Sequence, residues 1–149
     1  MKIDGIDKVI IKRLVKDART PILSIAREVG ISGAAIHQRL RKLEKSNLIK
    51  GYKMLINPKS LGYNTTAFVG VFLEDSHQLL SVIKRLKEIP EILESHCTTG
   101  SYSIFLKVIC KDNEDLMRLL NTKVKVIKGV SKTESIISLE QQVAREISI

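Results

Sequence analysis

Three apolar stripes with helical spacing run through the first 46 residues and predict three amphipathic helices. The stripes are Ile6, Val9, Ile10 and Leu14 in residues 5–17, then Ile22, Ile25, Ala26 and Val29, and finally Ile36, Leu40 and Leu43 in residues 33–46. Thr20 is the expected cap of the second helix, with Pro21 at the first helical position, and Gly30 is typical of a helix end. Ser32 is a suitable cap for the third helix.

The second and third helices have the spacing of a helix-turn-helix motif over about residues 22–41. The small Ala26 allows close approach, Gly30 supplies the turn four residues later, and Ile36 fills the core between the helices. An ordinary helical hairpin uses the same local signals. The outer surface of the third helix therefore has to decide between the two.

The stretch after the third helix predicts a short strand followed by a hinge. Residues 48–56 read as the strand, and the sequence NPKSLG at 57–62 breaks the pattern. The strand is a candidate to pair with its counterpart in a second chain. These features divide the chain into a winged-helix-like helix-turn-helix domain at 1–50, a linker at 51–63 and a second domain at 64–149.

From residue 64 onward the pattern follows the order strand, helix, strand, strand, helix, strand. The expected strands cover residues 64–73, 92–98, 102–109 and 130–139, and the middle two form a hairpin about Gly100-Ser101. The expected helices begin at caps Ser76 and Asn113, and Pro90 and Gly129 end them. This order predicts an α+β fold whose second domain is a ferredoxin-like βαββαβ sandwich. Because both helices lie on one side of the sheet, a second copy is the simplest cover for the other side.

The whole chain has a formal net charge of +9. All of this excess positive charge lies in the first part of the chain. Residues 1–63 hold 14 Lys and Arg against 5 Asp and Glu, whereas residues 64–149 hold 11 of each kind. A basic domain beside a neutral one predicts a polyanionic partner for the first and a different task for the second.

The third helix is the candidate contact surface for double-stranded DNA. Its side opposite the apolar stripe carries no acidic residue and consists of Ala34, Gln38, Arg41 and Lys45, flanked by His37 and Lys42. A merely solvated helix usually interleaves Glu with Lys. We therefore interpret this side as a reader of the major groove, with Ser32, Gly33 and Ala34 letting the helix start approach the DNA backbone. His37 has no other His or Cys within helical reach, so we expect no metal site.

Several other functional classes are not expected. No apolar run approaches the ~18 residues that span a bilayer, and Asp4 and Asp7 interrupt the start where a signal peptide would be apolar. We expect a cytoplasmic, DNA-associated protein without membrane contact. We expect no enzyme and no cofactor, because His96 and Cys97 are strand neighbours on opposite faces and no glycine-rich phosphate loop is present.

Residues 3–145 resemble the Lrp/AsnC, or feast/famine, transcription factors. The resemblance lies in four stretches in a fixed order, IDGIDKVIIKRLVKDART, IAREVGIS, RLRKLEKSNLIKGY and NPKSLGY. It implies that two chains form a homodimer through their C-terminal domains. It also implies that dimers assemble into octamers or other higher oligomers and that amino acids bind at the interfaces between dimers.

The resemblance further implies an effector-binding role for the loop consisting of Thr98, Thr99, Gly100, Ser101, Tyr102 and Ser103. Family members often carry Asp three residues after this glycine, whereas this chain carries Ser103. A hydroxyl offers an ammonium group only a neutral hydrogen bond, which is about half as strong as one to a carboxylate. The alternative for this loop is a plain β-turn.

Two functions remain open at this point. One is a sequence-specific regulator modulated by a small molecule, and the other is an architectural protein that compacts DNA with little sequence preference. Gln38 favours the first, because an amide in the groove can pair with adenine, whereas compaction needs only cations.

Overall fold

The computed structural model describes residues 2–147, which form two compact units. One unit contains the chain up to Leu55 together with the C-terminal segment from Val143 onward. The other unit is Ile56–Gln142. Each unit has a hydrophobic core of its own.

The division between the units falls inside the predicted linker at 51–63, whose exact limits stay a prediction. Met1 and residues 148–149, the outer ends of the two predicted domains, lie outside the described residues.

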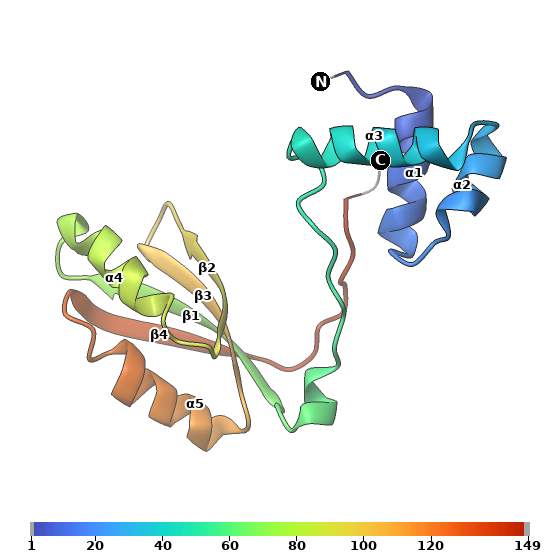
Figure 1. The fold of residues 1–149 in the computed structure, drawn as a ribbon. Helices are drawn as coiled ribbons and strands as arrows, with labels where there is room; N and C mark the ends of the chain where they lie inside the picture. Colours follow the sequence, from blue (N-terminus) through green and yellow to red (C-terminus); the bar gives the residue numbers. More distant parts are fainter. Residues whose placement is uncertain (1, 148–149) are drawn as a thin grey trace. The chain divides into compact units, whose positions relative to one another are not determined.

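The N-terminal unit is built from three helices, α1 (Gly5–Lys16), α2 (Ile22–Val29) and α3 (Gly33–Lys45) (Figure 1). Their apolar stripes meet in one core, which consists of Ile10, Ile11, Ile25, Ala26, Ile36, Leu40 and Leu43. The predicted cap of α3 is confirmed, because the hydroxyl of Ser32 accepts the backbone N–H of Ala35 at 3.2 Å.

Two predictions for this unit are wrong. Thr20 does not cap α2: its hydroxyl donates to the carbonyl of Asp17 at 2.7 Å and closes the turn after α1, while Pro21 occupies the cap position. The predicted strand at 48–56 is not formed, and residues 50–57 have no regular secondary structure. A strand is stabilised by hydrogen bonds to a neighbouring strand, and the described chain supplies none to this segment.

The C-terminal unit contains an antiparallel sheet of four strands in the order β2-β3-β1-β4. Its elements are η1 (Pro58–Leu61), β1 (Thr65–Leu73), η2 (Ser76–Gln78), α4 (Leu79–Leu86), β2 (Ile92–Cys97), β3 (Ile104–Cys110), α5 (Asn113–Leu119), η3 (Leu120–Val124) and β4 (Val130–Ser138). This order confirms the predicted α+β class and the βαββαβ sequence of elements.

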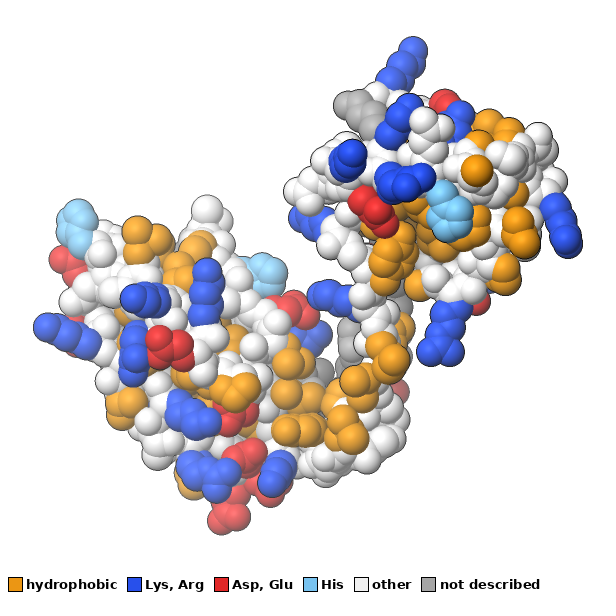
Figure 2. Space-filling view, viewed as in Figure 1, with side chains coloured by type: hydrophobic (Ala, Val, Ile, Leu, Met, Phe, Trp, Pro, Cys, Tyr) orange, Lys and Arg blue, Asp and Glu red, His pale blue; other side chains and the backbone are white. Residues whose placement is uncertain are grey.

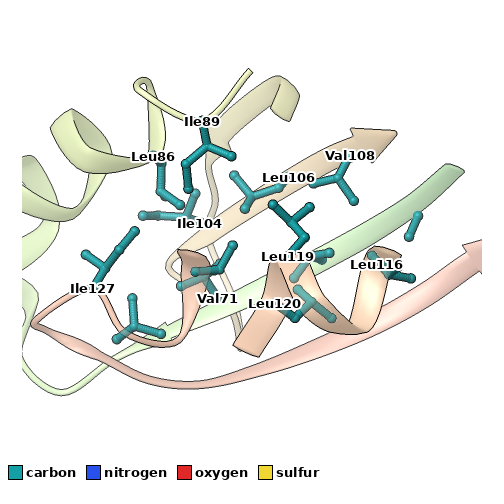
Figure 3. Close-up of a cluster of buried hydrophobic side chains, with 14 of the residues drawn as sticks. Val71, Leu86, Ile89, Ile104, Leu106, Val108, Leu116, Leu119, Leu120 and Ile127 are labelled. Carbon is teal, nitrogen blue, oxygen red and sulfur yellow. The ribbon is translucent and has the colours of Figure 1, made fainter. Parts of the chain in front are cut away.

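Helices α4 and α5 pack on the same face of this sheet (Figure 1). Figure 3 shows how Val71, Ile104 and Leu106 from the strands meet Leu86 and Leu119 from the helices. Successive strand residues point to opposite faces, so the alternate residues of β1 and β3 lie on the face that carries no helix.

The caps of two helices in this unit lie one residue before the predicted caps, and the predicted caps Ser76 and Asn113 are the first helical residues. The carboxylate of Asp75, not Ser76, accepts the backbone N–H at the start of η2. Similarly, Asp112, not Asn113, caps α5 by accepting the N–H of Asp115 at 2.7 Å. Helix α4 ends at Leu86, before the proline that was expected to end it.

A cluster of two carboxylates and one guanidinium ties α1 to α3. Asp4 and Asp7 cap the start of α1 reciprocally, each accepting the other's backbone N–H, at 2.9 and 3.2 Å. One amino group of Arg39 on α3 donates to both carboxylates, at 2.6 Å to Asp4 and 2.8 Å to Asp7. Asp7 is buried, so the ion pair also satisfies a charge that has little access to water.

The same contacts shift the pKa of Asp4. Its carboxyl accepts the backbone N–H of Asp7 and, in addition, a hydrogen bond from Arg39, and both stabilise the ionised form. The pKa of Asp4 therefore lies below its ordinary value.

We predict that Asp4→Asn destabilises the N-terminal unit at neutral pH but not at acid pH. An asparagine oxygen can still cap the helix, so the variant keeps the cap and loses the charge together with the hydrogen bond from Arg39. A carboxyl with a depressed pKa stabilises the fold above its unfolded pKa of about 3.9 and loses that contribution as the pH falls through the lower folded pKa. Hydrogen exchange of the α1 amides from neutral to acid pH should show a gap to wild type that closes at low pH.

Asp17→Asn is the matched control. Asp17 accepts the backbone N–H of Arg19, which asparagine can also accept, and it forms no ion pair with the described residues. A gap for Asp4→Asn that persists at every pH would show that its charge is not the stabilising feature.

Candidate nucleic-acid interface and effector loop

A left-handed glycine sets the angle between α2 and α3. Gly30 has φ 72°, and the backbone N–H groups of Gly30 and Ile31 both donate to the carbonyl of Ala26. Only three residues, 30–32, separate the two helices. This is the short glycine-containing turn of a helix-turn-helix, so the turn predicted from the sequence is confirmed.

The outward side of α3 is exposed to solvent, as the helical periodicity requires. The six residues predicted to face a groove are all exposed, namely Ala34, His37, Gln38, Arg41, Lys42 and Lys45. The apolar stripe of the same helix is buried in the core of the unit. Lys and Arg side chains also project from the visible side of the unit labelled α1–α3 (Figure 2).

The cations on this side of α3 are not neutralised within the described chain. Among residues 2–147, Arg41, Lys42 and Lys45 form no ion pair. The nearby carboxylate of Glu44 accepts a hydrogen bond from the hydroxyl of Tyr52 at 3.3 Å. Unpaired cations on one side of a helix attract a polyanion more strongly than cations held in ion pairs.

The two residues at the start of α3 have structural tasks. Ser32 is exposed and uses its hydroxyl as the helix cap. Gly33 is half-buried, and a Cβ atom at this position would lie 3.2 Å from a methyl group of Leu23 on α2. The absence of a side chain at Gly33 therefore allows the two helices to pack closely. A side chain at this position would point toward α2 and not toward solvent.

Three ion pairs made by two arginines connect the helices of this unit and were not predicted from the sequence. Arg39 donates to Asp4 and Asp7, as described above, and Arg13 on α1 forms a two-bond ion pair with Glu28 on α2, at 2.8 and 2.9 Å. The sequence feature that could have indicated the Arg39 ion pairs is the position of Arg39 beside the buried stripe of α3 and not opposite it. The basic charge of the unit thus has two parts, one that braces the helices and one that remains available to a partner.

The predicted effector loop is a closed turn whose first four residues are exposed. The hydroxyl of Thr98 donates to the carbonyl of Tyr102 at 2.6 Å, and the N–H of Thr98 donates to the carbonyl of Ser103 at 3.2 Å. Gly100 has φ 108°, which side chains other than glycine rarely adopt. Thr99 and Ser101 lie beside it on the outside of the turn, while Tyr102 and Ser103 are half-buried.

The face of the sheet without helices carries a row of aromatic rings. We call it the aromatic face and define it by Phe68, Phe72, Tyr102, Phe105 and Ile136. Phe68 and Phe105 stack with ring centroids 5.8 Å apart, and Tyr102 contacts both Phe72 and Phe105 at 5.1 and 5.9 Å. Ile136 on β4 lies opposite Phe68 and is 61% exposed.

Charged pairs border the aromatic face on both sides. Lys107 on β3 pairs with Glu94 on β2 at 3.1 Å, and Lys132 pairs with Glu134 on β4 at 3.2 Å. The face thus combines an apolar centre with a rim that holds equal numbers of positive and negative charges.

His96 and Cys97 point to opposite faces of the sheet, as predicted. Cys97 lies opposite the core residue Ile104, whereas His96 lies opposite Phe105 on the other face. Burial raises the pKa of the Cys110 thiol to about 11. Within residues 2–147, no helix is long and apolar enough to cross a membrane.

Two family models together match most of the chain. Residues 3–44 match the AsnC-type helix-turn-helix domain, and residues 66–147 match the Lrp/AsnC ligand binding domain. The first match covers α1 to α3, and the second contains the sheet, its helices and the loop at 98–103.

Named relatives and solved structures agree with these matches. The regulatory protein AsnC of Haemophilus influenzae is 39% identical over 145 residues, 97% of each chain. The transcriptional regulator LrpA of Pyrococcus horikoshii is 38% identical over 93% of this chain and 98% of its own. The structure of Escherichia coli AsnC superposes with a TM-score of 0.95 at 33% identity over the full length of both chains. With both domains matched and relatives similar along nearly their whole length, this chain belongs to the Lrp/AsnC family of transcriptional regulators.

Proposed function

We propose that this protein regulates transcription by reading DNA as a paired chain and that an amino acid bound at the loop 98–103 modulates it. The observation that carries the DNA-binding part is the outward side of α3, which is exposed, basic and free of ion pairs within the described residues. A helix presented in this way by a helix-turn-helix fits the major groove. Reading DNA in this way corresponds to a cytoplasmic, DNA-associated protein.

The side chains of α3 divide into two kinds of expected contact. Gln38 lies near the centre of the outward side, where its amide can pair with the N6 and N7 atoms of adenine. Arg41 and Lys45 follow about one and two turns later, where the helix leaves the groove floor and approaches the phosphates. Ser32 and Ala34 lie at the start of the helix, where small residues let the backbone come close, and His37 and Lys42 flank this row.

The aromatic face supports a homodimer. Exposed apolar patches on soluble proteins mark interaction surfaces, and the balanced ion pairs at its rim suit a two-fold partner that presents the same charges in reverse order. A dimer of this kind would present two α3 helices to half-sites whose centres are about one helical turn, or a multiple of it, apart. Further assembly of dimers, to octamers or other oligomers, belongs to the same proposal.

The proposal of an amino-acid effector rests on the loop and on one relative. A Mycobacterium tuberculosis feast or famine regulatory protein, 28% identical with a TM-score of 0.91 over 99% of this chain and 100% of its own, was solved in complex with L-methionine. In this chain, Thr98, Thr99, Gly100 and Ser101 present exposed hydroxyl and backbone groups. Ser103 occupies the position at which, by the family resemblance, other members often carry Asp.

We predict different losses for Gln38→Ala and Lys45→Ala. The first should reduce the preference for one base pair in each half-site by about 1–3 kcal/mol and leave the salt dependence unchanged. The second should weaken all sequences alike and lower the slope of log K against log salt by about 1. Affinities for a cognate site, a point-mutated site and random DNA, measured over a range of salt concentrations, separate the two.

Lys87→Ala is the control for the lost charge, because Lys87 is exposed at the end of α4 in the other unit. If Gln38→Ala weakens every duplex equally, α3 does not read bases, and the architectural function is favoured instead.

We predict that Ile136→Asp converts the dimer into monomers. A carboxylate that replaces an apolar side chain within an interface loses its hydration without gaining a partner. Sedimentation velocity should report a single-chain mass for this variant. Leu80→Asp, a change of the same size at a 79% exposed residue of α4, should remain dimeric, and a dimeric Ile136→Asp would place the interface elsewhere.

We predict that Ser103→Asp strengthens amino-acid binding. A carboxylate forms a charge-assisted hydrogen bond with an ammonium group, about twice as strong as a neutral one, which corresponds to a gain of several-fold in affinity for L-methionine. Ser103→Asn is the matched variant, since it has the same size without the charge. Isothermal titration calorimetry that finds equal affinities for the two variants would show that position 103 does not contact the ammonium group.

A further inference from the structure

Tyr102 belongs to the predicted effector loop by sequence but to the aromatic face by the position of its ring. The ring meets Phe72 of β1 edge to face at 5.1 Å and stacks on Phe105 of β3 at 5.9 Å. Its hydroxyl donates to the carboxylate of Glu134 on β4 at 3.2 Å. One side chain of the loop therefore contacts three of the four strands.

A glycine on the central strand makes room for this ring. A Cβ atom at Gly70 would lie 2.3 Å from the ring of Tyr102, much closer than real Cβ atoms approach their neighbours. Gly70 pairs with Phe105 on one side and Glu134 on the other, the same two residues that contact the tyrosine. The ring therefore lies directly on the backbone of β1, at a position where every other amino acid would displace it.

The contacts of Glu134 extend this arrangement to the rim of the face. Its second carboxylate oxygen accepts a hydrogen bond from Lys132 at 3.2 Å, and the ammonium group of Lys132 lies 4.2 Å from the centre of the Phe72 ring. A displacement of the tyrosine would thus alter an aromatic contact and an ion pair of the same face.

The backbone of Tyr102 and Ser103 is fixed by hydrogen bonds within the loop and to β1. The carbonyl of Tyr102 accepts the hydroxyl of Thr98, and the N–H of Ser103 donates to the carbonyl of Val71 on β1 at 3.1 Å. Between these two anchors lies Gly100, whose φ of 108° holds the turn in a conformation that favours glycine. A ligand that changes the turn must therefore either break these bonds or move Tyr102 with them.

We propose that Tyr102 is a positioning residue that couples the conformation of the loop 98–103 to the pairing of two chains through the aromatic face. This inference rests on the proposed function, in which the aromatic face forms the dimer. Occupation of the loop and pairing of the face then act on the position of one ring, so each changes the free energy of the other by the same amount.

A double-mutant cycle on the dimer dissociation constant tests this coupling without any ligand. Gly100→Val alters the turn from a position whose Cβ would touch nothing within 4 Å, so any effect on pairing must travel through the loop. Tyr102→Leu removes the ring and keeps an apolar side chain, and Tyr102→Phe keeps the ring without its hydroxyl. The dissociation constants of wild type, the three single variants and the double variants Gly100→Val/Tyr102→Leu and Gly100→Val/Tyr102→Phe are measured by sedimentation over a dilution series.

We expect Gly100→Val to raise the dissociation constant about fivefold or more when residue 102 is Tyr or Phe and less than about twofold when it is Leu. An equal factor in both backgrounds, or no change in the tyrosine background, overturns the coupling. Circular dichroism of each variant identifies those that fail to fold, and for an unfolded Tyr102→Leu chain the Tyr102→Met variant takes its place.

Gly70→Ala provides an independent measurement from the opposite direction. The added methyl group displaces the ring while the sequence of the loop stays unchanged, so hydrogen exchange at the Thr98 amide should accelerate. Unchanged exchange at Thr98 contradicts the coupling. A dimeric Ile136→Asp variant, in contrast, identifies failure of the proposed dimer interface itself.

Discussion

A four-stranded sheet has two faces, and both helices of the C-terminal unit pack on the same one. This arrangement follows from the order of elements. Helix α4 connects β1 to the parallel strand β2, α5 connects β3 to the parallel strand β4, and crossovers of the usual right-handed sense place both helices on one face. The side chains of Phe68, Phe72 and Phe105 are consequently left on the other face with a rim of ion pairs. The proposed pairing of two chains, the proposed two-fold presentation of α3 and the proposed coupling through Tyr102 all depend on this uncovered face.

In the N-terminal unit, the constraint is to fix the orientation of a basic helix while leaving its outward cations without ion pairs. Three small helices bury few residues, so packing alone fixes their angles weakly. The two arginines that lie beside the core, Arg13 and Arg39, connect the helices through carboxylates. The cations on the outer side of α3 remain free of such pairs within the described chain. Cations beside the apolar stripe therefore form ion pairs with carboxylates of other helices. Cations opposite the stripe are the ones proposed to contact DNA.

Much of this organisation could be predicted from the sequence, because periodicity is a local property. The stripes of α1 to α3 and the alternation in β1 follow directly from helix and strand geometry. The caps are less certain: Asp75 and Ser76 are both good capping residues, and the direction in which the chain enters the helix decides between them. The same holds for Asp112 and Asn113.

Features that depend on distant residues could not be predicted in this way. Arg39 meets Asp4 across 35 positions of the chain, and Tyr102 meets Gly70 across two strands. The segment at 48–56 has strand-forming residues, but the hydrogen-bonding partner that would make it a strand is absent from the described chain. Composition therefore describes what such a segment can form, and its neighbours determine whether it does.

The segment after α3 exposes apolar residues that proteases and chaperones recognise. Met54, Leu55 and Ile56 are consecutive, largely exposed and without regular secondary structure. Extended, exposed segments are where proteases cut, and apolar ones are what chaperones retain. If the proposed pairing of two chains covers this segment, a chain without its partner exposes these apolar residues and is the form that proteases cut first.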